Sequence, residues 1–340
     1  MKKNLFIINN EKCVNKNGNI YCQNLEIKLL ASDLKKFFNL FFLLRSSKIK
    51  PVHSIDCEKI SISSNIFTYI YKVFFSCFSK NSNYLIISIT PYTFLSFMVL
   101  FIFRKKMFLY LRSDGKKEIN LIFGKVLSYL YKLAEIVMCS DCEIITVNKD
   151  IIKNKDYTLV NPSSLNSDWF RDTNVPSLEQ INILYVGRIK IEKGIYSLLK
   201  IFKEMIKEKK DLNLTLIGHG NKIEDFENSV KIIPPIDDHK NLIKKYDENN
   251  IIVLPSFTEG HPRVLIEALA RKRPVIIFDE ISHVKQNYIG VFICKREKKN
   301  FLQTIETIIK NFKDIQKKMD KNVFPTREKF ATQLKDIIKV

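Results

Sequence analysis

The chain has 340 residues, and its 56 Lys and Arg outnumber its 36 Asp and Glu, which gives a formal net charge of +20 at pH 7. A hydrophobic content of 46% excludes a disordered protein, and only 9 Gly exclude a collagen-like fibre. The length predicts about two domains, and the 7 scattered Cys predict reduced thiols in a cytosolic protein rather than a disulfide framework.

Short apolar strands alternate with helical stretches along the chain, which indicates parallel sheets covered by helices on both faces. The predicted helices include Ile119–Met138, Ile195–Lys209, Val264–Ala270 and, at the end, Arg327–Lys339. The predicted strands are, in order, Leu5–Ile8, Leu40–Leu44, Leu85–Ile89, Met107–Leu111, Ile144–Val147, Thr158–Val160, Ile183–Val186, Leu212–Ile217, Ile251–Leu254, Val275–Phe278 and Val291–Cys294.

One uncharged run, Tyr84–Phe103, has the length of a membrane span. Its strand-like opening and the Thr90-Pro91 pair favour a buried strand, a turn and a buried helix, with a transmembrane helix as the alternative. We expect no secretory signal, because Lys2 and Lys3 precede only a short apolar run and no small-residue cleavage site follows.

The polar stretch from Asn161 to Gln180 is rich in Pro, Ser and Asn and precedes a fresh strand, so it predicts a domain boundary. We place one domain at residues 1–170, a second at 171–325, and a C-terminal helix at 326–340 that we expect to pack back on the first domain. Two successive doubly wound sheets predict a ligand cleft between them, at the carboxyl ends of the strands.

The most informative segment is Leu254–Ala270. A predicted strand ends at Leu254, a loop carries Glu259-Gly260, and Pro262 suits the first turn of a helix, where its missing N–H costs nothing. The N–H groups of Arg263–Leu265 then point out of the helix N terminus and favour binding of an anion such as a diphosphate.

Two carboxylates of this segment are placed to bind hydroxyls. Glu259 precedes the predicted helix and Glu267 lies in its second turn. A carboxylate accepts two hydrogen bonds, which matches a vicinal diol on a sugar or a ribose. The spacing alone fits a capped surface helix with two solvated Glu equally well.

A second segment, Ile183–Ile195, carries basic residues on a strand–loop–helix turn. The strand ends at Gly187, where a backbone can approach a ligand closely. Arg188 and Lys193 follow, and they could hold a diphosphate from two sides. Taken alone, they also fit solvated loop residues.

Together, these segments resemble the retaining GT-B glycosyltransferases of family 4 (glycosyl transferases group 1). The resemblance covers about residues 183–295 and implies an α/β GT-B fold, in which two doubly wound Rossmann-like domains face a central cleft. It is carried by Val186-Gly-Arg188 with Lys193-Gly194, Leu216-Ile-Gly-His-Gly220, Tyr246, Pro255-Ser256, Glu259-x7-Glu267 with Ala268 and Ala270, and Pro274-Val275.

The resemblance implies a role for each matching residue of the second domain, which would bind the donor, a nucleotide-diphosphate sugar. Arg188, Lys193 and Glu259 would be the catalytic residues: the two cations bind the diphosphate and stabilise the leaving group, and Glu259 holds the transferred sugar. Donor binding would also involve Gly187, Gly260, His261, the backbone N–H groups of Val264 and Leu265, and Glu267, which would hold the ribose hydroxyls.

The family resemblance also implies that the anomeric configuration is retained without an established covalent nucleophile. In the favoured front-face mechanism, the departing phosphate helps to deprotonate the acceptor hydroxyl. We expect no metal and no other cofactor, because Asp-x-Asp is absent from the sequence and Cys139-x-x-Cys142 has no second pair at zinc-site spacing.

Three features depart from the family pattern. His219 stands where an acidic residue is common, His261 where an aromatic or apolar one is usual, and Arg263 where an apolar one is common. The glycine-rich loop often found after the next strand is replaced by Asp279–His283, so the resemblance does not identify the donor sugar. His261 and His283 also fit simple polar loop residues.

The first domain would lie on the acceptor side and matches the family only in layout. Gly18, in a loop after the first strand, is a candidate for approaching donor and acceptor. Arg112 and Asp114 follow the fourth strand and could touch the acceptor or the reacting sugar. A plain turn at Asp114-Gly115 fits equally well.

The net positive charge favours anionic partners. Lys35–Arg45 mixes basic and aromatic residues, which suggests a peripheral contact with an anionic membrane; a helix end followed by a buried strand is the alternative. We expect no nucleic-acid partner, because the basic residues are dispersed and no recognised motif is present.

The sequence therefore predicts transfer of a sugar to a glycan or polyprenol-linked acceptor during synthesis of a surface polysaccharide such as capsule or lipopolysaccharide. The expected location is the cytoplasm, at the cytoplasmic face of the inner membrane. The alternatives are another GT-B enzyme such as a nucleotide-sugar epimerase, a non-catalytic GT-B binding protein, and a nucleic-acid binder, which would bind oligonucleotides in a salt-sensitive way.

Overall fold

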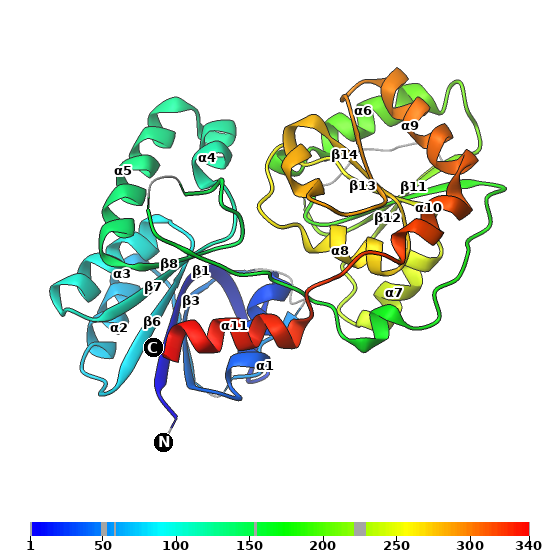
Figure 1. The fold of residues 1–340 in the computed structure, drawn as a ribbon. Helices are drawn as coiled ribbons and strands as arrows, with labels where there is room; N and C mark the ends of the chain where they lie inside the picture. The colour runs from blue at the N-terminus through cyan, green and yellow to red at the C-terminus, as the bar shows by residue number, and fades with distance from the viewer. Residues whose placement is uncertain (1, 49–52, 58, 153–154, 221–228, 340) are drawn as a thin grey trace. The chain divides into compact units, whose positions relative to one another are not determined.

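The computed structural model describes residues 2–48, 53–57, 59–152, 155–220 and 229–339 (Figure 1). The chain divides into two compact units. Unit 1 combines Met1–Pro162 with Arg327–Val340, and unit 2 is Ser163–Thr326. The last helix therefore belongs to the same unit as the first strands.

The elements of unit 1 alternate as βα pairs around one sheet. They are β1 (Asn4–Lys16), β2 (Asn19–Cys22), α1 (Leu25–Leu34), β3 (Asn39–Ser46), β4 (His53–Ser54), β5 (Ile60–Ser63), α2 (Ile66–Ser76), β6 (Ser82–Ile87), α3 (Pro91–Ile102), β7 (Lys106–Leu111), α4 (Gly115–Phe123), α5 (Lys125–Asp141), β8 (Glu143–Thr146), β9 (Thr158–Leu159) and α11 (Arg327–Lys339).

The sheet of unit 1 is mostly parallel. Its parallel strands run in the order β5-β3-β1-β6-β7-β8-β9. The distal half of β1 pairs antiparallel with β2, and β2 pairs antiparallel with β4. One face is covered by α1 and α11 and the other by α2, α3 and α5 (Figure 1). Apolar side chains of the parallel strands fill both cores, which explains their near-continuous apolar sequence.

Unit 2 contains a second sheet with its own core. Its elements are η1 (Ser167–Phe170), β10 (Ile181–Val186), η2 (Ile191–Lys193), α6 (Ile195–Met205), β11 (Leu212–Ile217), β12 (Val230–Ile233), α7 (His239–Asp247), β13 (Ile251–Leu254), α8 (Arg263–Ala270), β14 (Val275–Phe278), η3 (Asp279–Lys285), β15 (Val291–Cys294), α9 (Lys298–Lys310) and α10 (Phe312–Met319).

All strands of this sheet are parallel, in the order β12-β11-β10-β13-β14-β15. This is the doubly wound order of a Rossmann fold, and it reverses between β10 and β13. Unit 1 reverses in the same way between β1 and β6. The predicted α/β class with two doubly wound units is thus confirmed.

The run Tyr84–Phe103 forms a strand, a turn and a helix. Thr90 caps α3 and Pro91 occupies its first position, as the Thr90-Pro91 pair predicts. Among the helices in the part of the chain that the structure describes, none is long and apolar enough to cross a bilayer. The transmembrane alternative for this run is therefore wrong.

The helix predicted at Ile119–Met138 is wrong as a single element. It is two helices, α4 and α5, which meet at Gly124. Gly124 has φ 83° and ψ −178°, a conformation that an L side chain rarely adopts, so the chain turns there instead of continuing the helix.

The stretch Lys35–Arg45 is a helix end followed by the strand β3. Its apolar side chains Phe38, Leu40, Phe42 and Leu44 lie in the core beneath α1 and α11. These side chains are therefore not available to a membrane, and the structure favours the buried-strand alternative for this stretch.

Candidate functional site

The reversal of strand order in unit 2 creates a place for a ligand. Where two neighbouring parallel strands connect to helices on opposite faces, their loops separate at the carboxyl ends and leave a crevice. Gly187 and Arg188 follow β10 at this point, and Pro255 and Ser256 follow β13. The strands of both sequence segments singled out above thus end side by side in the sheet.

Glycines allow the loops to pack closely here. Gly194 has φ 66°, and a Cβ built on it would lie 1.8 Å from the carbonyl oxygen of Pro255. A Cβ on Gly218 would lie 1.8 Å from the carbonyl oxygen of Gly187. The quoted Gly motifs therefore hold three neighbouring loops in contact.

The structure brings Lys193 and Glu259 together. The Lys193 ammonium lies at the end of η2, and its Nζ is 2.6 Å from Glu259 Oε1. Ser256 Oγ donates a hydrogen bond to the same oxygen, also at 2.6 Å. A cation expected at the diphosphate and a carboxylate expected at the sugar therefore neutralise one another in this structure.

Glu267 is buried and held by two hydroxyls. Tyr246 donates to its Oε2 at 2.8 Å, and Ser164 donates to Oε1. Burial, followed by the charge of Glu267, raises the pKa of Tyr246 well above its usual value, so this phenol stays a donor. The carboxylate is thus fixed in orientation at the second turn of α8.

The N terminus of α8 has no side-chain cap. Such an end presents backbone N–H groups and the positive end of the helix dipole to an anion. The Leu265 N–H already donates to the Pro262 carbonyl at 3.1 Å, so a phosphate must share or replace that bond. Arg263 adds a cation beside this end, and its buried Nη1 has no hydrogen-bond partner within the described residues.

The other predicted donor-side residues lie in the loops that follow β10 and β13. The Arg188 side chain is half exposed, and its Nη2 lies 4.0 Å from Glu192 Oε1. Gly260 is buried and His261 is partly buried in the loop between β13 and α8. The His283 ring, on η3, hydrogen-bonds the backbone carbonyl of Glu259 at 2.9 Å. The replaced loop Asp279–His283 therefore supports the Glu259 loop directly.

Arg296 ties the surrounding loops together and was not found by sequence reasoning. Its Nη1 donates to Ser197 Oγ at 2.8 Å and to the Pro255 carbonyl at 2.9 Å. Its guanidinium also stacks on the rings of Phe257 and Phe278. Ser164 was missed as well, because no local pattern shows that it reaches Glu267.

The candidates of unit 1 have structural partners of their own. Gly18 follows Asn17 in a two-residue hairpin turn, where both residues have positive φ. Asp114 caps α4 by accepting a hydrogen bond from the Lys117 N–H at 3.0 Å, which gives the expected turn at Asp114-Gly115 its physical reason. A role for either residue at the acceptor stays a prediction.

Arg112 is held by an ion pair, with its Nη1 2.6 Å from Glu26 Oε2. Burial disfavours the charged guanidinium, but Glu26 outweighs this and raises the pKa of Arg112. Arg112 therefore carries a fixed positive charge at the carboxyl end of β7.

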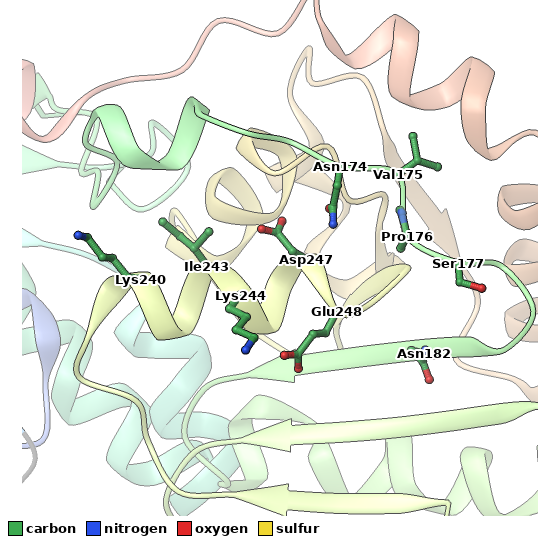
Figure 2. A pocket seen from close by; sticks show the side chains of 10 residues that line it. All are labelled: Asn174, Val175, Pro176, Ser177, Asn182, Lys240, Ile243, Lys244, Asp247 and Glu248. Carbon is green, nitrogen blue, oxygen red and sulfur yellow. The ribbon is translucent and has the colours of Figure 1, made fainter.

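A separate surface hollow of about 510 Å³ lies on unit 2 between α7 and the segment that precedes β10. Figure 2 shows Asn174, Pro176, Asp247 and Glu248 around it, with Asn182 at the amino end of β10. None of the predicted donor residues lines it. Within the described residues, no group of three His, Cys, Asp or Glu side chains could hold a metal ion.

Comparison with known proteins finds a family match within the second unit. Residues 180–311 match the family described as "Glycosyl transferases group 1". This span contains Arg188, Lys193, Glu259 and Glu267. The match thus falls on the residues that the structure brings to the crevice at β10 and β13.

The chain is similar to an uncharacterized glycosyltransferase of Haemophilus influenzae, at 29% identity over 188 residues, which is 52% of each chain. It is also similar to the capsular polysaccharide biosynthesis glycosyltransferase CapM of Staphylococcus aureus, at 30% identity over 37% of this chain and 36% of CapM. The chain thus spans about half or less of the length of these relatives.

Two solved structures share the fold over nearly the whole chain. Sucrose-phosphate synthase of Thermosynechococcus elongatus has a TM-score of 0.72 at 15% identity and covers 99% of this chain and 98% of its own. HepE of Anabaena, in complex with UDP and glucose, has a TM-score of 0.65 at 12% identity over 99% and 95%. At these identities the likeness concerns the fold.

Proposed function

We propose that this chain is a retaining glycosyltransferase of family 4 that moves a sugar from a nucleotide-diphosphate sugar to a glycan or polyprenol-linked acceptor. The observation that carries the proposal is the pair Lys193–Glu259 at the switch point of unit 2, with Glu267 held on α8, the helix that follows the Glu259 loop. The match of this unit to the glycosyl transferases group 1 and the UDP bound by HepE support a nucleotide donor.

Each residue acts by binding and by charge. Arg188 and Lys193 bind the diphosphate and stabilise the negative charge that grows on it as the bond from the sugar to the phosphate oxygen breaks. The uncapped N terminus of α8 adds backbone N–H donors at Val264 and Leu265. Glu267 orients the ribose.

Glu259 binds hydroxyls of the transferred sugar and holds its reacting carbon against the acceptor. The acceptor oxygen forms the new bond on the same face that the phosphate leaves, and the acceptor proton passes to the departing diphosphate. All charges in this scheme come from the chain and the donor, and no metal is invoked.

The name of CapM supports a place in the synthesis of a cell-surface polysaccharide such as capsule or lipopolysaccharide. We place the reaction in the cytoplasm, at the cytoplasmic face of the inner membrane, where nucleotide sugars and polyprenol-linked acceptors meet.

The proposal is tested first at the donor site. Thermal shifts with UDP, GDP, ADP and CMP, and with their common sugars, are measured for the wild type, Glu267→Ala and the surface control Glu306→Ala. Ligand binding to the folded state raises the melting temperature by mass action. We expect one diphosphate to stabilise the wild type and the control but not Glu267→Ala. A well-folded protein that responds to no nucleotide contradicts the donor site.

The type of reaction is then determined in an activity assay with the nucleotide sugar that binds. A glycosyltransferase releases the nucleoside diphosphate when an acceptor is added, and nuclear magnetic resonance of the product shows the retained anomeric configuration. An epimerase changes the sugar without any acceptor. A binding protein does neither.

A further inference from the structure

Unit 1 exposes an unusual amount of apolar surface on one side of its sheet. Most of the exposed large hydrophobic side chains that the structure describes lie between Phe67 and Val137, on or next to α2, α3, α4 and α5. On the opposite side of the same sheet, the described residues of α1 and α11 contribute no exposed large hydrophobic side chain. The exposed apolar side chains are therefore concentrated on one side of the sheet and are not spread over the whole unit.

The apolar face is defined here by Phe67, Tyr71, Phe75, Phe78, Phe101 and Ile102, which lie on α2 and α3 or directly after α2. These helices pack side by side on the sheet (Figure 1). The exposed fraction reaches 82% for Phe67, 63% for Phe78 and 71% for Ile102. Exposed apolar patches of this kind usually mark an interaction surface.

Aromatic rings contact one another at the C-terminal ends of the two helices. The ring of Phe103 lies 5.4 Å from that of Phe74 and 5.8 Å from that of Phe78, measured between centroids. Tyr71 and Phe75 lie 4.5 Å apart on the same helix. The rings form a continuous surface instead of single exposed side chains.

The charge around this surface has one sign. From Lys59 to Ser113 the chain contains no Asp and no Glu, and every charged side chain is Lys or Arg. Lys80 and Arg104 are exposed and follow the C-terminal ends of α2 and α3. Lys80 is two residues after Phe78, and Arg104 directly follows Phe103. Lys80 and Arg104 therefore give the apolar face a basic border, while Lys106, further along the chain, is paired with Glu143 at 3.0 Å.

We infer that the apolar face of α2 and α3 docks on an anionic lipid bilayer. The aromatic and aliphatic side chains enter the boundary between headgroups and acyl chains, and Lys80 and Arg104 bind the lipid phosphates. The helices lie in the plane of the interface, since the 12 residues of α3 span only about 18 Å, less than a bilayer core of about 30 Å.

The charge decides between a bilayer and a second copy of the chain. In a two-fold interface the same basic border would meet itself, because this stretch offers no carboxylate as a partner. An anionic bilayer supplies the missing negative charge. The inference does not depend on sugar transfer, so each can fail without the other.

The test is flotation of the full chain with vesicles. One set contains phosphatidylcholine alone and the other contains about 30% phosphatidylglycerol, at low salt and at about 1 M NaCl, where surface charges are screened. We expect flotation with the anionic vesicles at low salt and weaker flotation at high salt. Absence of flotation with anionic vesicles at low salt overturns the inference.

Variants locate the contact. The triple variant Phe67→Ser/Phe78→Ser/Ile102→Ser removes exposed side chains only, so we expect at least about a tenfold loss of vesicle partitioning. The matched control Val175→Ser/Ile232→Ser/Val323→Ser removes three exposed apolar side chains of unit 2 and should bind like the wild type. Equal binding of both triple variants overturns the assignment to this face.

If the triple variant does not fold, a single conservative substitution to Trp provides a fluorescence test of the same contact. The only native tryptophan, Trp169, is buried in unit 2. In Phe67→Trp, we expect a second emission that shifts to shorter wavelength on anionic vesicles and is quenched by brominated lipid, whereas Val323→Trp should not be quenched. No quenching of Phe67→Trp overturns the inference. So does a dimer in ultracentrifugation that the triple variant dissociates, if vesicles are not bound.

Discussion

At the scale of single residues, Lys193 and Glu259 form an ion pair. We propose that Lys193 binds the diphosphate of the donor and that Glu259 binds its sugar. Glu259 Oε1 accepts from both Lys193 and Ser256. A bound diphosphate would attract Lys193 and so compete with Glu259 for it. The pair therefore keeps the cation in place in the absence of ligand, at some cost to the affinity for a diphosphate.

This competition predicts opposite effects on binding and on turnover. Glu259→Gln should raise the affinity for the nucleoside diphosphate about fivefold, because a partly buried ion pair of about 1 kcal/mol no longer holds Lys193. Sugar transfer should fall, because the carboxylate that we propose to bind the sugar hydroxyls is lost. Calorimetric titration and a turnover assay measure the two effects, and weaker diphosphate binding by Glu259→Gln would show that the carboxylate does not compete.

Lys193→Ala is the matched comparison. It removes the cation itself, so both the diphosphate affinity and the turnover should fall. If Glu259→Gln and Lys193→Ala weaken diphosphate binding to the same degree, the two residues form a purely structural pair.

At the scale of elements, the buried side chains of Arg271 and Arg273 hold the first segment of unit 2 against α7 and α8. Arg271 donates to the carbonyls of Trp169 and Arg171. Arg271 and Arg273 both pair with Asp247, at 2.7 and 3.5 Å. Burial lowers the pKa of Arg273 to about 10, although Asp247 opposes this shift. Asp247 is therefore the counter-ion for two desolvated guanidinium groups.

Loss of this counter-ion should be costly. Asp247→Ala leaves the buried arginines without a counter-ion, and we expect a loss of about 3 kcal/mol in the free energy of unfolding. Glu248→Ala, at the more exposed neighbouring position, should change it by less than about 0.5 kcal/mol. Urea unfolding followed by the fluorescence of Trp169, which packs against Tyr246, reports this directly. Equal stability of the two variants contradicts the role of Asp247.

The pair Glu280–Arg296 predicts a pH dependence. Burial is the largest single effect on Glu280 and opposes its ionisation. The hydrogen bond from Arg296 at 2.7 Å, a hydrogen bond from the backbone N–H of Glu280 and the charge of Arg296 together outweigh burial and lower the pKa of this carboxyl. The unfolded chain then takes up the proton first as the pH falls. The pair stabilises the fold above the ordinary carboxyl pKa, and this contribution disappears as the pH drops through the lowered value.

We therefore compare the wild type with Glu280→Gln by thermal unfolding between neutral pH and about pH 3. The side chain is 37% exposed, so solvent limits the difference at neutral pH to about 1 kcal/mol or less. We expect the wild type to lose this advantage below about pH 4.5. A difference that stays constant with pH would mean that the charge of Glu280 does not contribute.

The sequence predicted the parallel strands well because their apolar runs are buried on both faces. β11, β13, β14 and β15 have the predicted bounds. Short or half-exposed strands such as β2 and β12 were missed, since they lack such a run. The break at Gly124 was missed because a single Gly within an apolar periodic pattern does not reveal its φ.

For the candidate site, too, the sequence predicted one part and missed another. Local motifs placed Lys193 and Glu259 next to strand and helix ends and Glu267 in the second turn of a helix, because loop and cap signals are short in sequence. The partners of these residues could not be predicted. Ser164 reaches Glu267 across 103 positions and Arg296 reaches Pro255 across 41, and only the packing of the sheet brings them together.

At the scale of the whole molecule, the chain leaves unit 1 and returns to it. α11 buries Phe330, Leu334 and Ile338 in the core under the sheet. Arg327 Nε pairs with Asp33 at 2.8 Å, and the Asn83 amide donates to the carbonyl of Ile338 at 2.6 Å. Unit 1 therefore needs the last residues of the chain to complete its core.

This connectivity predicts that damage to the last helix loosens the first strands. Leu334→Ala should cost about 2–5 kcal/mol, because a fully buried leucine is truncated in a core that relaxes only partly. Hydrogen exchange should then accelerate in β1, β6 and α1, which lie far away in sequence, while the exchange of β10 and β13 and the unfolding transition of Trp169 stay unchanged. Val323→Ala, at a position with an exposed fraction of 84%, is the control and should change neither unit. Faster exchange in β10 and β13 together with β1 would instead show that the two units unfold as one.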